Sequence, residues 1–227
     1  MAVRPERRDL IMKSYKKTII ITTLITLLPI LFGLALWNKL PDTIATHWGA
    51  DVQANGWSSK AFAVFGLPCI LAVTHLFTVC VTLNDPKKNN IHKKPLTLVF
   101  WIVPVISIAV NGLTYLLALG MDIDIVSIIF ALVGIVFIAL GNYMPKLQQN
   151  YTVGIKLPWT LNSIENWNRT HRLGGKLFIL GGFLLIIDGF CGRLLGENFV
   201  LAAMLGIILV CSVIPMGYSF WLFKKGV

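Results

Sequence analysis

The chain has 227 residues, of which 56% are hydrophobic and only 13% are charged, and its mean hydropathy is +0.75. Soluble domains carry about a quarter charged residues, so this composition excludes an ordinary soluble domain and predicts an integral membrane protein. The net charge of +10 could suggest nucleic-acid binding, but the sequence has no zinc-finger spacing and no aromatic RNA-binding motif. We therefore expect no direct nucleic-acid partner, and membrane lipid as a partner.

Six apolar runs are long enough to cross a bilayer. A hydrocarbon core about 30 Å thick needs roughly 20 mostly apolar residues per helix. The runs lie at residues 18–37, 61–83, 96–119, 123–141, 173–190 and 199–223. They are apolar all round and lack the period of two that barrel strands show. The sequence therefore predicts an all-α polytopic bundle of about six transmembrane helices, whose weakest member is the fifth, with Lys176 and Asp188 near its ends.

The distribution of basic residues predicts the orientation. Seventeen of the 20 Lys and Arg residues fall on one side, in the N-terminal segment, the second loop, the fourth connection and the C-terminus. Because cytoplasmic loops are rich in Lys and Arg, both termini are expected in the cytoplasm. No small-residue cleavage site follows the first run, so we expect a retained signal anchor.

This topology divides the chain into four expected parts. They are a basic segment at 1–17, a two-helix module at 18–95 with an outer loop at 38–60, a third helix with an outer turn at 96–125, and a C-terminal region at 126–227 with a cytoplasmic loop at 142–172. Both of these loops are too long for plain turns, and loops of this length tend to be functional. Function is therefore sought first in the two long loops.

The outer loop combines turn signals at 41–42 and 55–56 with two tryptophans and a histidine. Trp gathers at membrane interfaces whatever its task, so an aromatic belt is one interpretation. Trp is also a frequent anchor in recognition, so a platform for an outside ligand is the other. No His or Cys at metal-ligand spacing accompanies the histidine, so no metal site is expected. The candidate ligand-contacting residues are His47, Trp48, Trp57 and Lys60.

Two features inside the predicted spans have a structural interpretation. His75 has no carboxylate beside it in its run, which favours an interhelical hydrogen bond over a proton relay. Gly175, Gly182 and Gly189 are seven residues apart and form one stripe on the fifth helix. Small residues allow close helix approach, so this helix is expected to be central in its bundle.

Enzyme signatures are absent from the sequence. It contains no HExxH, no GxSxG, no Walker loop and no kinase motifs. The four cysteines form no CxxC pair and no disulfide framework. We predict no catalytic residue, no cofactor and no enzymatic activity.

The cytoplasmic loop carries its own local pattern. Pro145 and Pro158 break any continuous helix, and Thr160 could cap a short one. Residues 163–172 are the better helix candidate, with Trp167 and His171 four apart on one face. This predicts an amphipathic elbow at the inner interface.

Three stretches of this loop closely resemble the signature of the SdpI family, bacterial membrane proteins named for immunity to a secreted peptide toxin. The stretches are GNYMPK at 141–146, NYTVGIKLPWTL at 150–161 and WNRTHR at 167–172. The outer pattern from Pro41 to Lys60 looks like the N-terminal module that accompanies SdpI regions. One departure is Lys156-Leu157, where the family usually has Arg-Thr.

The resemblance implies a multi-pass protein of the bacterial cytoplasmic membrane and leaves three functions open. They are immunity to a secreted peptide toxin, sensing that is passed to a cytoplasmic regulator, and small-solute transport or membrane enzymology. Fold-level likeness does not by itself transmit a ligand. The candidate residues that it adds in the cytoplasmic loop are Asn142, Pro145, Asn150, Gly154, Pro158, Trp159, Thr160, Trp167, Thr170 and His171.

Overall fold

The computed structural model describes residues 5–49, 53–87 and 90–227. In that part of the chain, six helices are long and apolar enough to cross a membrane, and the one sheet has two strands. The prediction of an all-α polytopic bundle is confirmed. The chain forms two compact units, the first made of Met1–Trp48, Ala54–Asn84 and Thr97–Ile123, the second of Gly49–Gln53, Asp85–Leu96 and Asp124–Val227.

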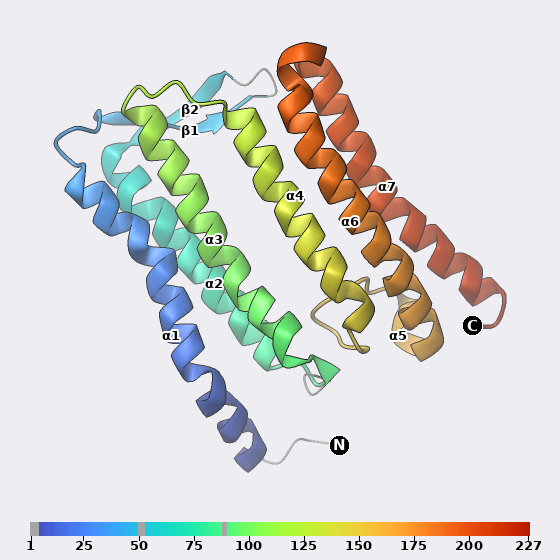
Figure 1. The fold of residues 1–227 in the computed structure, drawn as a ribbon. Helices are drawn as coiled ribbons and strands as arrows, with labels where there is room; N and C mark the ends of the chain where they lie inside the picture. Colours follow the sequence, from blue (N-terminus) through green and yellow to red (C-terminus); the bar gives the residue numbers. More distant parts are fainter. Residues whose placement is uncertain (1–4, 50–52, 88–89) are drawn as a thin grey trace. The chain divides into compact units, whose positions relative to one another are not determined.

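In the described part of the first unit, long helices lie beside a β-hairpin (Figure 1). The first helix begins before its apolar run, since a proline suits the first turn and no helix breaker follows it until the span. The elements are α1 (Pro5–Ala35), β1 (Thr43–Trp48), β2 (Ala54–Ser59), the π-helical turn η1 (Phe62–Gly66), α2 (Leu67–Leu83) and most of α3 (Lys93–Ala118).

Polar side chains link the three helices of this unit. His75 is fully buried, and its Nε2 atom lies 3.0 Å from the Thr22 hydroxyl of α1. The Ser107 hydroxyl of α3 donates to the Thr26 carbonyl at 2.7 Å, and Asn111 donates to the Ser107 carbonyl. The interhelical hydrogen bond expected for His75 is therefore confirmed.

The outer loop is an antiparallel hairpin, which the sequence analysis did not predict. Thr43 pairs with Ser59, and the register shifts on both sides of His47. The turn signal at 55–56 was wrong, because Asn55 and Gly56 lie within β2. Gly56 faces His47 so closely that an added Cβ would lie 2.9 Å from the His47 Cβ. The glycine therefore allows close strand approach and does not form the turn.

The second unit packs α6 between α4 and α7 (Figure 1). The predicted interfacial helix at 163–172 and the predicted fifth span form one continuous helix, since the Ser163 hydroxyl accepts from the Asn166 amide at its start and no proline interrupts it. The elements are α4 (Ile125–Tyr143), the 3₁₀ turn η3 (Met144–Lys146), α5 (Pro158–Asn162), α6 (Ile164–Leu195) and α7 (Glu197–Lys224).

Glycines bring α4 and α6 into backbone contact. A Cβ added at Gly182 would lie 2.5 Å from the Gly134 carbonyl oxygen, and one at Gly175 would lie 2.7 Å from that of Gly141. At the other face of α6, a Cβ at Gly181 would lie 2.5 Å from the Cys211 sulfur of α7. The central position expected for the glycine-striped helix is therefore confirmed within this unit.

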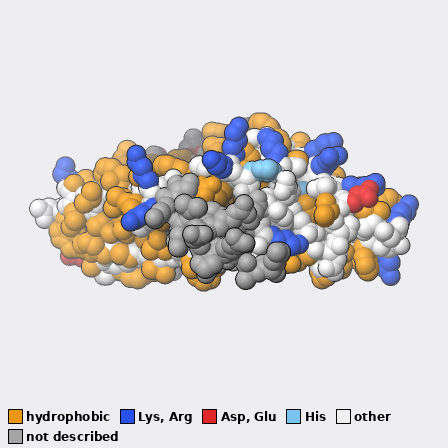
Figure 2. Space-filling model, turned by 90° about the horizontal axis from the view of Figure 1, so that it is seen from below, with side chains coloured by type: hydrophobic (Ala, Val, Ile, Leu, Met, Phe, Trp, Pro, Cys, Tyr) orange, Lys and Arg blue, Asp and Glu red, His pale blue; other side chains and the backbone are white. Residues whose placement is uncertain are grey.

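The end of α7 returns to the start of α6. The Asn166 amide donates to the carbonyl of Val227, the last residue, at 3.3 Å. The C-terminus therefore lies on the same side as the cytoplasmic loop, as it must if the fifth run crosses the membrane. Figure 2 looks onto this end of the helices, where Lys and Arg side chains are numerous at the surface and acidic ones few.

Candidate functional site

The outer candidates occupy the hairpin. His47 and Trp48 lie on β1 and Trp57 lies on β2. His47 is exposed and its Nδ1 atom is hydrogen-bonded across the strands to the Asn55 side chain. Trp48 is half-buried, whereas Trp57 exposes 61% of its surface. Of these side chains, Trp57 offers the largest apolar face to an outside molecule.

Lys60 closes the base of the hairpin. Its ammonium lies 3.1 Å from the Asp42 carboxylate, donates to the Trp37 carbonyl and sits 5.3 Å from the centroid of the Trp37 ring. The Asp42 side chain is 99% exposed, so this ion pair alone contributes little. The three contacts together join the end of β2 to the segment before β1.

The cytoplasmic motif is held by side chains that hydrogen-bond to its own backbone. Asn150 is fully buried, its Oδ1 atom accepts from the Thr152 and Val153 amides, and its amide donates to the Gln148 carbonyl. Gly154 has a φ of +116°, a region that L side chains rarely adopt. An added Cβ there would collide with the Nε2 atom of His171. The backbone at Gly154 thus requires glycine for both conformation and space.

Trp167 and His171 form the centre of the loop. Both are fully buried, and their rings stack at 3.9 Å between centroids. The Trp167 indole donates to the Leu147 carbonyl at 2.7 Å. His171 bonds the Trp167 carbonyl through Nδ1 and accepts the Ile155 amide at Nε2. Only the neutral ring with its proton on Nδ1 satisfies both bonds.

The short helix α5 is fixed at its first turn. Thr160 is buried, and its hydroxyl accepts from the Leu157 amide and donates to the Ile155 carbonyl. Pro158 begins the helix and is exposed. Trp159 is half-buried, with its ring 5.4 Å from that of Phe220 on α7. Thr160 therefore does not start the helix: Leu157 is its N-cap, and Thr160 stabilises the first turn from the third helical position.

A second polar cluster joins α6 to α7. The Thr170 and Ser219 hydroxyls both donate to the Asn166 side-chain oxygen, and the Asn166 amide donates to the Ser219 carbonyl. All three side chains are fully buried. The remaining candidates, Asn142 and Pro145, lie at the surface. The motif therefore divides into a buried scaffold and a smaller exposed part.

Two family models match parts of the chain. Residues 146–219 match the model of the SdpI/YfhL protein family, and residues 24–72 match a domain of unknown function, DUF1648. The C-terminal third of this chain is thus similar to the SdpI/YfhL family. It is 28% identical over 206 residues to a protein named Immunity protein SdpI from Bacillus subtilis (strain 168), a match that covers 91% of this chain and 96% of that protein. No solved structure matches the chain.

The SdpI/YfhL match, the similarity to Immunity protein SdpI and the six apolar helices make the chain a multi-pass protein of the bacterial cytoplasmic membrane. The SdpI/YfhL match includes the whole buried scaffold from Leu147 to Ser219. The DUF1648 match includes the complete hairpin. The DUF1648 match thus contains the outer loop, and the SdpI/YfhL match contains residues 146–172 of the cytoplasmic loop.

Sequence reasoning missed Asp85, which lies between the two regions that the family models match. It is 4% exposed; its Oδ2 atom accepts from the Tyr151 amide and the Thr152 hydroxyl, and its Oδ1 atom accepts from the Lys87 amide. The Lys87 ammonium donates to Gln149 and lies 5.0 Å from the Tyr151 ring centroid. The sequence predicts only a basic turn after α2. The one indication of a specific contact there is an isolated acidic residue among lysines. In the structure, Asp85 joins the loop after α2 to the cytoplasmic motif.

Replacing Asp85 with asparagine should destabilise the cytoplasmic loop by about 1–3 kcal/mol. Both carboxylate oxygens only accept hydrogen bonds, so an amide in either orientation places a donor against a donor. We expect faster trypsin cleavage after Lys156, measured on the full-length protein in detergent. Asp122→Asn, at an exposed position, is the control, and equal cleavage rates for the two variants would contradict the prediction.

Proposed function

We propose that this chain is a membrane immunity protein that protects a bacterial cell from a secreted, membrane-active peptide toxin. The observation that carries the proposal is the similarity to a named immunity protein along nearly the full length of both chains. Because the match covers 96% of that protein, no separate domain of the relative is missing from this chain. This relation also favours a role without catalysis.

The hairpin supports a first contact between the toxin and this protein on the outer side of the membrane. A toxin that attacks the membrane from outside meets the extracytoplasmic loops before the helices. Trp57 presents an exposed aromatic face there, and rigid aromatic side chains give large contact area at small entropic cost. The scaffold around Trp167 instead has its polar groups bonded internally, which suits a supporting role.

Survival of challenged cells tests the proposal. Bacillus subtilis lacking its own Immunity protein SdpI would express this chain and be exposed to the toxin that this relative counters. We expect at least tenfold more survivors than with an empty vector. Unchanged survival at normal membrane expression would refute the function.

Trp57→Ala should lower that protection at least several-fold without lowering the amount of protein in the membrane, because the side chain packs little in the folded state. Trp221→Ala is the matched control. This tryptophan is 49% exposed and lies in the last turn of α7, near the C-terminus. Survivors would be counted at matched membrane levels. Equal protection by the two variants would remove Trp57 from the toxin contact.

A regulator-contacting role for the cytoplasmic loop is a second proposal with its own observation. Tyr151 and Ile164 expose 48% and 68% of their surfaces beside the buried scaffold. Exposed apolar side chains at a loop are suited to a protein partner. Photocrosslinking from position 151 in living cells should capture one specific cytoplasmic protein, and its absence would count against sensing.

A further inference from the structure

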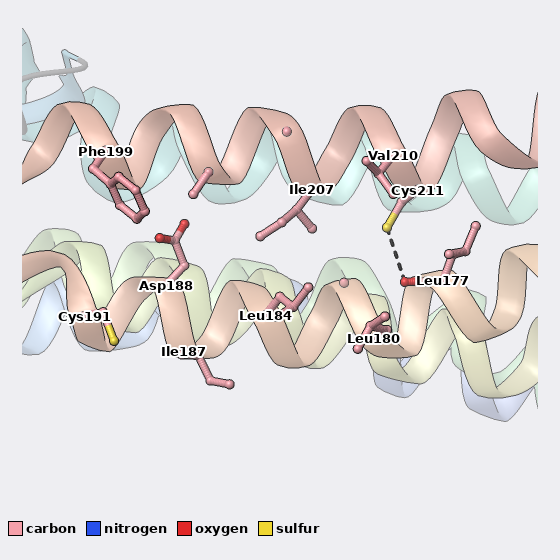
Figure 3. Close-up of a pocket in the computed structure, with 13 residues that line it drawn as sticks. Leu177, Leu180, Leu184, Ile187, Asp188, Cys191, Phe199, Ile207, Val210 and Cys211 are labelled. Carbon is pink, nitrogen blue, oxygen red and sulfur yellow. Dashed lines mark hydrogen bonds between the residues drawn. The ribbon is translucent and has the colours of Figure 1, made fainter. Parts of the chain in front are cut away.

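A groove on the second unit runs between α6 and α7, and the Asp188 carboxylate is among the described residues that line it (Figure 3). Its volume is about 480 Å³, and its walls include Leu184, Ile187 and Phe199. Asp188 is the acidic residue among those that line it. Figure 3 shows the Asp188 carboxylate directed from α6 toward α7, beside Phe199.

One oxygen of the buried Asp188 carboxylate has no hydrogen-bond partner among the described residues. The residue exposes only 6% of its surface, and its Oδ2 atom has no hydrogen-bond partner in the part of the chain that the structure describes. A charge taken from water without a partner is costly. Acidic residues inside membrane spans are accordingly rare and mark sites of function.

The groove extends into the outer half of the membrane. Its lining follows α6 from Cys191 to Leu177, roughly 20 Å at 1.5 Å per residue. Counted from Cys191, where the apolar span of α6 ends, this length is more than half of a hydrocarbon core about 30 Å thick. This length accommodates several turns of an inserted helix.

We propose that this groove binds a membrane-inserted helix of a cationic peptide, with a Lys or Arg side chain of the peptide paired to Asp188. The proposal rests on the proposed immunity function and names how the toxin is recognised. The apolar walls receive the apolar face of the helix, and the basic side chain supplies the missing partner. Asp188 and the groove walls then act as one site.

A lipid is a poorer occupant than a peptide for two reasons. An acyl chain fills the apolar walls but leaves the Asp188 carboxylate without a partner. The amine of a lipid headgroup lies at the membrane interface, whereas Asp188 lies a turn deeper than Cys191 at the groove's outer end. A lysine or arginine on a peptide helix carries its charge on a long flexible stem that can reach this depth.

Two glycines of α7 provide a matched pair for blocking the groove. A Cβ added at Gly206 or at Gly217 meets no atom within 4 Å. Gly206 lines the groove and Gly217 does not. Gly206→Leu should therefore fill the groove, while Gly217→Leu adds the same side chain elsewhere on the same helix.

The direct test measures peptide binding by the full-length protein in vesicles of phosphatidylcholine and phosphatidylglycerol. The probe is a fluorescent leucine-rich helix with one lysine in its outer half, compared with the same helix with leucine there. Asp188→Asn should weaken binding of the lysine peptide at least tenfold and leave the leucine peptide unchanged. Gly206→Leu should weaken both, and Gly217→Leu neither.

Two results would overturn the inference. One is equal affinity of the lysine peptide for the wild type and Asp188→Asn. The other is loss of peptide binding when phosphatidylethanolamine replaces phosphatidylcholine, which would identify an aminolipid as the occupant. The survival assay separates the two proposals: if the wild type and Asp188→Asn protect cells equally, only the groove is wrong. If the wild type fails to protect, the immunity function is wrong, and the vesicle measurement still decides the groove.

Discussion

Replacing Trp167 with alanine should destabilise the second unit by about 3–5 kcal/mol, the usual cost of removing a large buried aromatic side chain. Trp167 is the largest of the fully buried side chains in the described part of the protein. Its removal leaves a cavity among Met144 and Leu147, frees the Leu147 carbonyl and removes the ring on which His171 stacks. The loop should therefore lose its central support.

The measurement is the midpoint of thermal unfolding of the full-length protein in detergent. Trp167→Phe separates the two contributions, since phenylalanine retains most of the buried ring but cannot donate to the Leu147 carbonyl. We expect it to cost about 1–3 kcal/mol. Trp221→Ala, at a half-exposed position, should change the midpoint little. A Trp167→Ala midpoint equal to that of Trp221→Ala would show that the scaffold does not support the loop.

The six membrane helices were predictable because their apolar runs are long enough to identify a span without tertiary information. The fifth run contained Lys176 and Asp188, yet its glycines at 175 and 182 indicated close packing, and the contacts with α4 confirm it. Its beginning was not predictable in the same way. The polar residues before the span continue the helix, and hydropathy reports only the apolar part.

The hairpin and the Asp85 contacts could not be read from the sequence for a common reason. Both depend on contacts between residues that are not sequence neighbours, across the hairpin for His47 and Gly56 and over 66 residues for Asp85 and Tyr151. The Gly56 position looks like a turn signal until His47 is placed opposite it. In the sequence, Asp85 is only an acidic residue in a basic loop, and its role becomes visible when the structure places Tyr151 and Thr152 beside it. Local patterns carry no information on such pairings.

Most of the cytoplasmic candidates lie together in the structure, but the sequence left their chemistry ambiguous. A tryptophan and a histidine four apart on a helix fit a ligand-contacting face as well as a buried one. The structure places Trp167 and His171 in the interior, with each ring nitrogen bonded to the backbone. Their part in ligand binding remains a prediction, and an indirect role through the shape of the loop fits these contacts best.

Replacing Gly182 with alanine should destabilise the second unit by about 1–3 kcal/mol through overpacking, or more if the helices cannot separate. The added Cβ would lie 2.5 Å from the Gly134 carbonyl oxygen and 3.0 Å from the Ile138 amide nitrogen. Both are backbone atoms of α4, so no rotamer change can relieve the contact. Because the same close approach recurs at Gly141 and Gly175, a local shift at Gly182 would disturb the whole α4–α6 interface.

Replacing Gly217 with alanine should change the stability of the protein in the opposite direction. A Cβ there meets no atom within 4 Å, and alanine in a helix interior is favoured over glycine by up to about 1 kcal/mol. Unfolding midpoints measured side by side in detergent should therefore move down for Gly182→Ala and stay equal or move up for Gly217→Ala. If both variants shifted in the same direction, helix propensity rather than backbone contact would govern this interface, and the close packing of α4 on α6 would not be what stabilises the unit.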